Sequence, residues 1–219
     1  MVLGDELAMD IALADGSVLL TTPSAGRFYG VGSFQERQVQ RVRLSVQAGE
    51  LAWLPQETLV FAGANAQLDT HIDLGPAAQL CYWDLIVLGQ PAGGQRFDRG
   101  CLQQNLEVCR GGRPLLRERL ALHAGDRFSQ SPIGLDGCST FGIFLCTDAL
   151  VEERVDHWLA LVNGAAPGAF TFSRRDGLSI ARYRGEDAAQ GRRGFAALWE
   201  SIEIARSGRA PAIPRVWHT

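Results

Sequence analysis

The chain has 219 residues, of which 46% are hydrophobic, with 25 glycines and a formal net charge of −3. This composition can supply the core of one globular domain, and the many glycines and turn signals favour a mostly β protein. The 21 basic residues are all arginine and form no block, which argues against nucleic acid or a membrane surface as the main partner. The five cysteines show no C-x-x-C spacing and indicate neither a disulfide framework nor a structural zinc site.

The amino terminus, MVLGDELAMD, has no basic segment followed by an apolar one, so no secretory signal is predicted. No apolar run approaches the roughly 20 residues that a membrane-spanning helix needs. We therefore expect a cytoplasmic protein.

The first predicted elements are strands. Residues 7–22 alternate loosely around Asp15-Gly16, a dipeptide typical of a tight hairpin turn, so this segment predicts a first hairpin. Residues Gln38 to Val46 alternate again and predict a further strand.

The stretch LAWLPQETLVFAG, residues 51–63, predicts a strand that is broken at Pro55, because proline cannot donate a ladder hydrogen bond. A period of two then places Glu57 on one face with Leu59 and Phe61. Glu57 either sits at a frayed strand start in water, or it lies inside and needs a donor, a metal or a partner chain.

The segment from Cys81 to Leu88, CYWDLIVL, has apolar residues on both faces, which is typical of a buried strand in a layered β fold. Asp84 shares a face with Tyr82, Ile86 and Leu88. Aspartate is depleted in strands, so Asp84 is expected to be either paired with an arginine or backbone amides, or functional.

The clearest predicted hairpin joins CLQQNLEVC to PLLRERLAL through the turn residues Gly111 and Gly112. With an even-numbered loop, Glu107 lies opposite Leu116 and Asn105 opposite Glu118. Glu107 and Glu118 are then diagonal neighbours on one face, about 7–8 Å apart. A loop of odd length would flip one strand and abolish this pairing.

Two later segments predict helices. Apolar residues from Val151 to Val162 recur at helical spacing and Asn163-Gly164 ends them, while Phe195, Leu198, Trp199 and Ile202 mark a second helix that ends near Gly208. Between the two helices, Phe170 to Tyr183 predicts a hairpin about Asp176-Gly177. The sequence shows no internal repeat and no linker, so residues 1–219 are expected to form a single domain.

The motifs of common enzyme classes are missing from the sequence. It contains no G-x-S-x-G elbow, no phosphate-binding loop and no H-E-x-x-H helix, and its four histidines are widely spaced. What remains is a set of carboxylates on apolar strand faces: Glu57, Asp84, Glu107 and Glu118. Oxygen ligands of this kind can guide a divalent metal without trapping it, which suits transport better than catalysis.

Five motifs, in order along the chain, closely resemble the urease accessory protein D family, which is called H in some bacteria. They are TTPSAGRFYG, WLPQET, YWDLIVLGQPAGGQRFDRG, GGRPLLRERL and PRVWHT. The resemblance implies a layered, helix-like stack of β-strands with two α-helices near the carboxyl end. It also implies a non-enzymatic chaperone that binds a helical accessory protein F and a GTPase, accessory protein G, docks on the urease apoprotein and helps insert nickel.

Because the family is proposed to offer nickel an internal passage, the resemblance gives Glu57, Asp84, Glu107 and Glu118 a role as transient metal contacts. No tightly bound cofactor is expected, only nickel in transit. We expect partner contacts near the carboxyl-terminal helix and tail, at Trp199 and at an exposed Trp217, with core packing as the alternative for Trp199.

The chain also departs from the family pattern. Family members carry residues before the GDEL-like segment, so the resemblance implies that the family's first strands are missing here. Several positions that are charged in the family are neutral, among them Ala52, Gly30, Gln90 and Gln95. One alternative is therefore a degenerate scaffold that binds its partners without transferring nickel. A further alternative is a small hydrolase whose catalytic residues are dispersed along the sequence.

Overall fold

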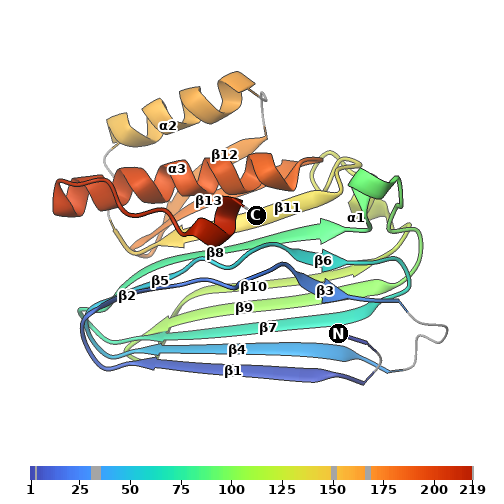
Figure 1. Ribbon diagram of the computed structural model, residues 1–219, viewed down its shortest axis with the longest axis horizontal. Helices are drawn as coiled ribbons and strands as arrows, with labels where there is room; N and C mark the ends of the chain where they lie inside the picture. The colour runs from blue at the N-terminus through green and yellow to red at the C-terminus, as the bar shows by residue number, and fades with distance from the viewer. Residues whose placement is uncertain (3, 31–35, 149–151, 166–168, 219) are drawn as a thin grey trace.

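Three turns of chain with the same shape stack on one another in the amino-terminal half of the computed structural model, which describes residues 1–2, 4–30, 36–148, 152–165 and 169–218 (Figure 1). Each turn follows a strand of one sheet, sheet A, rounds a corner and returns along a second sheet, sheet B. The three turns are β1 (Glu6–Leu13) with β2 (Ser17–Leu20), β4 (Gln38–Val46) with β5 (Glu50–Trp53), and β7 (Asn65–Leu74) with β8 (Gln79–Leu88). Stacked coils of this kind make the chain a β-solenoid-like single domain, and the predicted layered, mostly β fold is confirmed.

Parallel pairing runs through all three turns. In sheet A, β1 pairs with β4 and β4 with β7, while in sheet B β2 pairs with β5 and β5 with β8. Two short strands, β3 (Gly26–Phe28) and β6 (Thr58–Val60), continue β2 and β5 beyond irregular segments, and the segment before β6 contains Pro55. The predicted break at Pro55 is therefore confirmed.

The predicted hairpin over residues 7–22 is wrong. β1 and β2 belong to different sheets, and Asp15-Gly16 forms the corner between them. The corners hydrogen-bond to one another instead: the Glu50 amide donates to the Gly16 carbonyl (2.7 Å) and the Gln79 amide to the Gly49 carbonyl (2.8 Å). A β-carbon at Gly49, whose φ is +76°, would lie 2.1 Å from the Gly16 oxygen, so this stacking requires glycine.

The carboxyl-terminal half extends both sheets. In sheet A, β9 (Cys101–Arg110) pairs in parallel with β7, and β10 (Arg113–His123) turns back as the antiparallel edge. In sheet B, β11 (Thr140–Cys146) pairs antiparallel with β8, and the hairpin of β12 (Phe170–Arg175) and β13 (Leu178–Gly185) follows, as predicted. Short helical turns connect or end these elements: η1 (Pro91–Gly93), α1 (Arg127–Gln130) and η2 (Arg215–His218).

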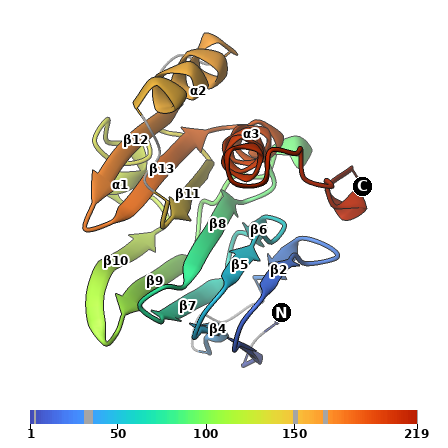
Figure 2. The ribbon, with the colours of Figure 1, turned by 90° about the vertical axis from the view of Figure 1, so that its left-hand side faces the viewer.

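Two helices cover the outer face of sheet B (Figure 2). They are α2 (Glu152–Ala165) and α3 (Ala188–Ser207), and α3 ends at Gly208 in the left-handed conformation (φ 70°). The predicted apolar stripe of α2 is buried at Val155, Trp158 and Val162, whereas Val151 lies outside the described residues. The stripe of α3 is buried at all four predicted positions, which are Phe195, Leu198, Trp199 and Ile202. Both helix predictions are confirmed.

Apolar side chains form three clusters. One fills the space between sheet B and the helices. The other two lie between the sheets, one near the corners and one toward the opposite ends of the strands. A row of polar side chains separates these two clusters, and this row positions the candidate site.

Candidate functional site between the sheets

Five strands of the two sheets each place one polar residue at the boundary between the two intersheet clusters. On β8, Asp84 stands between Tyr82 of one cluster and Ile86 of the other. The same position is taken by Thr70 on β7, Gln104 on β9, Glu118 on β10 and Arg182 on β13. We call these five residues the polar layer.

Asp84 joins the two sheets within the polar layer. Its carboxylate accepts a hydrogen bond from the Gln104 side-chain amide (2.8 Å). Burial raises the pKa of Asp84 to about 6, although the Gln104 hydrogen bond and the Leu85 backbone amide oppose the shift. A carboxylate held this way at near-neutral pH can exchange a proton or accept a cation. The predicted pairing of Asp84 thus uses an amide rather than an arginine.

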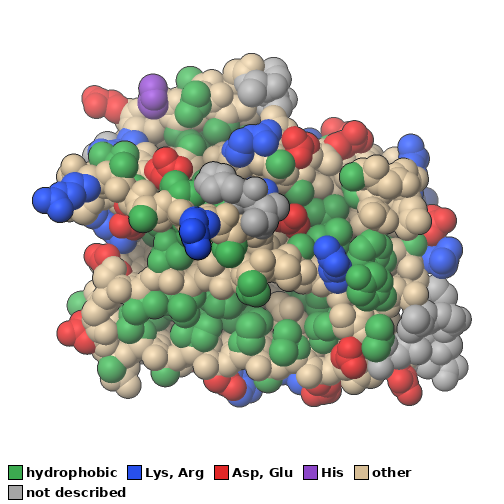
Figure 3. Space-filling model, viewed as in Figure 1, with side chains coloured by type: hydrophobic (Ala, Val, Ile, Leu, Met, Phe, Trp, Pro, Cys, Tyr) green, Lys and Arg blue, Asp and Glu red, His purple; other side chains and the backbone are tan. Residues whose placement is uncertain are grey.

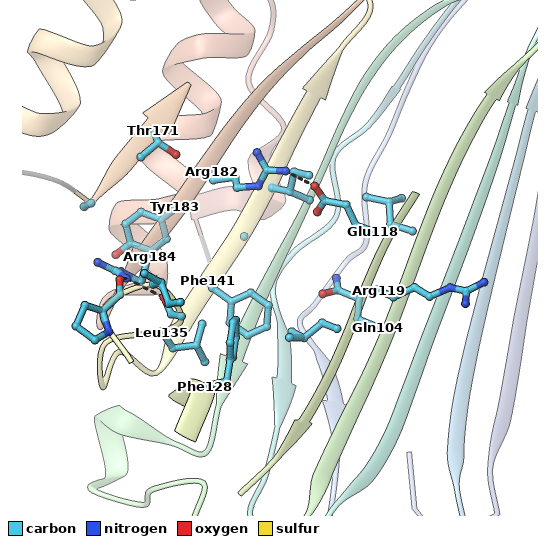
Figure 4. Close-up of a pocket in the computed structure, with 18 of the residues that line it drawn as sticks. Gln104, Glu118, Arg119, Phe128, Leu135, Phe141, Thr171, Arg182, Tyr183 and Arg184 are labelled. Carbon is cyan, nitrogen blue, oxygen red and sulfur yellow. Dashed lines mark hydrogen bonds and ion pairs between the residues drawn. The ribbon is translucent and has the colours of Figure 1, made fainter. Parts of the chain in front are cut away.

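Glu118 lies at the open side of the polar layer, in a cleft of about 790 Å³ between β10 and the β11 and β13 strands (Figure 4). Its carboxylate forms an ion pair with Arg182 across the cleft. Phe128, Phe141 and Leu135 line the same cleft beside Gln104, so the wall is part apolar and part charged. The Gln104 side chain connects this cleft to Asp84 behind it.

Glu107 is not a neighbour of Glu118, and the predicted register of the β9–β10 hairpin is wrong. A β-bulge between Pro114 and Leu116 shifts the pairing by one residue, so Glu107 faces Arg117 and Glu118 faces Leu106. Glu107 therefore lies on the outer face of sheet A, opposite to Glu118. There, the hydrogen bond from Arg117 is the main cause that lowers the pKa of the Glu107 carboxyl, and His71 makes a smaller contribution. His71 also contacts Asp73 (2.8 Å).

Glu57 also lies outside the polar layer, just before β6. Its carboxylate pairs with Arg192 of α3 (3.0 Å), and the same guanidinium donates to the Gln56 side-chain oxygen (2.6 Å). The Gln56 amide nitrogen donates in turn to the Val216 carbonyl of the tail. The segment WLPQET thus fastens α3 and the carboxyl-terminal tail to sheet B, which gives this glutamate a structural partner.

The expectation that Trp217 is exposed is wrong. Its side chain is 7% exposed, packs on Trp83 and Trp199 at centroid distances of 4.9 and 5.5 Å, and donates from Nε1 to the Thr21 hydroxyl (3.1 Å). Trp199 is buried in the core under α3 as well. Trp199 and Trp217 thus pack the carboxyl-terminal tail against the core. A partner contact at either of them stays a prediction.

Of the four acids, the structure brings only Asp84 and Glu118 into one interior. Sequence reasoning missed Thr70, Gln104 and Arg182, although each occupies an inward position of an alternating strand, which a search for polar residues on inward faces would have found. Among the described residues, no group of three or more His, Cys, Asp and Glu side chains is arranged to hold a metal ion. No described helix is long and apolar enough to cross a membrane.

These features define the chain as a β-solenoid with a helical cover and a polar layer through its interior. The family model described as UreD urease accessory protein matches residues 1–218, and the chain belongs to this family. The resemblance seen in the sequence is thereby confirmed.

Named relatives agree with the family match. The chain is 39% identical over 218 residues to the urease accessory protein UreD of Pseudomonas fluorescens strain Pf-5, covering 99% of this chain and 76% of that protein. It is 34% identical over 224 residues to UreD of Saccharophagus degradans, covering 100% of this chain and 76% of that protein. It is 39% identical over 221 residues to UreD of Nitrosococcus oceani, covering 99% of this chain and 72% of that protein. Family membership supports a role in urease maturation.

Proposed function

We propose that the chain is a binding chaperone that helps insert nickel into the urease apoprotein, in a complex with the helical accessory protein F and the GTPase accessory protein G. The observation that carries the proposal is the polar layer, because it crosses an otherwise apolar interior from the cleft at Glu118 to Asp84. No catalytic step is assigned to the chain. Nickel is cargo in transit and not a resident cofactor.

The chemistry of the polar layer suits brief contacts with a cation. Carboxylate and amide oxygens at Asp84, Gln104 and Glu118 are hard ligands, which hold a borderline ion such as nickel less firmly than imidazole or thiolate would. At Glu118 an arriving cation competes with the Arg182 guanidinium for the carboxylate. Weak, replaceable ligation favours release to the next site.

The test is urease activation in a bacterial strain that lacks its own D protein but retains F, G and apourease. Expression of this chain is expected to restore urease activity and urease nickel content, measured by mass spectrometry of the purified enzyme. The chain is also expected to co-purify with F and G when all three are co-expressed. Failure of that co-purification would refute the proposal.

A degenerate scaffold, which binds the partners without transferring nickel, is the second candidate. The ion pair with Arg182 favours this candidate, because the guanidinium already neutralises the Glu118 carboxylate at the open side of the polar layer. Such a scaffold would co-purify with F and G yet leave urease without nickel. Full activation by the chain excludes this alternative.

A further inference from the structure

The cleft beside Glu118 lies at the edge of sheet A that β10 forms. β10 pairs with β9 on one side, and no other strand in the described part of the chain pairs with it. It also borders the cleft of about 790 Å³, which is lined by residues between Gln104 and Arg184 (Figure 4). Backbone donors and acceptors of an edge strand can pair with an added strand, and many proteins recognise extended peptides in this way.

Sheet B extends one strand further than sheet A at this cleft. The Glu118–Arg182 ion pair places β10 over β13, and β12 follows β13 in sheet B, whereas no described strand follows β10 in sheet A. Thr171 of β12 lies opposite Arg182 of β13 and therefore faces inward, as does Ser173, yet both are exposed. A strand added to β10 would cover these residues and complete the layer.

Arginines on the outward face of β10 determine which charge an added strand should carry. Arg117 pairs with Glu107 of β9, whereas Arg119 lies opposite Asn105 and makes no ion pair with another described residue. Figure 4 shows the Arg119 side chain pointing away from the cleft. On the face in front of β2 and β5, by contrast, Figure 3 shows arginines spread among acidic side chains. Opposite charges attract across paired strands, so acidic residues fit beside Arg119.

The cleft itself favours apolar side chains on the other face of an added strand. The loop that follows β10 closes one end of the cleft and presents Phe128, which is 40% exposed, and Ile133, which is 96% exposed. Successive side chains of a strand point to opposite faces. A strand that is acidic outward and apolar inward would therefore match both surfaces at once.

We propose that β10 and the cleft bind an extended segment of a partner protein in which acidic and apolar residues alternate. The segment adds a strand to β10, places its acids beside Arg117 and Arg119, and buries its apolar side chains against the cleft wall. A second copy of β10 is a poor occupant, because it would bring two arginine rows together. The bound segment also covers Glu118 at the open side of the polar layer.

The test uses a fluorescent peptide of alternating glutamate and valine, capped at both ends and as long as β10. Fluorescence anisotropy with the purified chain is expected to show saturable binding. A peptide with lysine in place of glutamate is expected to bind several-fold more weakly. Hydrogen exchange is expected to slow for β10 amides when the glutamate peptide is added.

A charge reversal at Arg119 locates the contact. Arg119→Glu changes an exposed side chain, so the variant is expected to fold, as checked by circular dichroism. It is expected to bind the glutamate peptide several-fold more weakly and the lysine peptide more tightly than the parent chain does. The matched control is Arg43→Glu, which makes the same charge change on β4, separated from β10 by β7 and β9, and is expected to leave both affinities unchanged.

Absence of saturable binding by the glutamate peptide would overturn the proposal. So would equal weakening in Arg119→Glu and Arg43→Glu, which would indicate attraction to net charge alone, or protection of amides outside β10. Sedimentation equilibrium without peptide tests the other occupant, because a dimer that protects the β10 amides would assign this edge to a second copy. Urease activation does not enter these measurements, so their outcome is independent of the proposed function.

Discussion

The carboxylate of Asp84 on β8 accepts a 2.8 Å hydrogen bond from the side-chain amide of Gln104 on β9, so a polar contact spans the gap between the two sheets. Buried polar groups of this kind are costly unless paired, and the pair lies between two apolar clusters that would otherwise be continuous. Apolar side chains at these two positions would join the clusters into one core without the Asp84–Gln104 pair. We therefore expect this contact to have a functional role.

The position of each acid predicts which ones matter for nickel. Asp84→Asn and Glu118→Gln remove carboxylates of the polar layer and are expected to lower urease nickel content several-fold in the complementation strain. Glu107→Gln is the matched control, because Glu107 lies on the outer face of sheet A, and it is expected to leave nickel content unchanged. Equal loss in all three variants would mean that the interior position carries no special role.

Asp84 also predicts a pH dependence of stability. Its pKa is about 6 in the folded chain against an ordinary value of 3.8, so the folded state binds more protons than the unfolded state between these values. The contribution of Asp84 is most favourable below pH 4, and it is lost as the pH rises through 6. The loss is on the order of 2–3 kcal/mol, since one pKa unit corresponds to about 1.4 kcal/mol.

The measurement for this prediction is urea denaturation of the parent chain and Asp84→Asn between pH 4 and pH 7. The asparagine variant cannot ionise, so its stability relative to the parent is expected to increase across this range. A relative stability that stays constant with pH would show that Asp84 titrates normally.

Where a strand shows a clear period of two, its faces could be predicted from the sequence. In Cys81–Leu88 this period correctly placed Asp84 on one face with Tyr82, Ile86 and Leu88. Two local signals misled. Asp15-Gly16 is a good turn dipeptide, but the sequence does not say whether the chain turns back in its own sheet or crosses to another. The bulge at Pro114–Leu116 inserts one residue and moves Glu118 to the opposite face from Glu107.

The stacked coils themselves leave little trace in the sequence. Their repetition depends on backbone hydrogen bonds between corners and on parallel pairing, neither of which requires similar side chains from one coil to the next. Arg182 illustrates the remaining difficulty: it lies 64 residues after Glu118, and only the packing of sheet B over sheet A brings the two together.

Gly194 is expected to stabilise the packing of α3 on the β12–β13 hairpin by leaving room for Phe170. A β-carbon at this position would lie 2.2 Å from Cζ of Phe170, whereas one at Gly164 of α2 meets nothing within 4 Å. Gly194→Ala should lower the free energy of unfolding by about 1–3 kcal/mol through overpacking. Gly164→Ala should leave it unchanged or raise it by up to about 1 kcal/mol.

Chemical denaturation of both glycine variants checks this difference. Comparable stabilities for the two would show that Phe170 moves aside at little cost.

The burial of Trp217 predicts that the tail stabilises the chain. Trp217→Ala removes an indole that packs on Trp83 and Trp199, and losses of this kind cost about 3–5 kcal/mol. Thr21→Val keeps the packing but removes the acceptor of the indole N–H, and it is expected to cost about 1–3 kcal/mol. Denaturation of both variants tests the packing, and co-purification with accessory protein F separates packing from a direct contact. A stable Trp217→Ala chain that has lost the partner would restore Trp217 as a partner contact, whereas a destabilised chain that still binds F assigns it to the core.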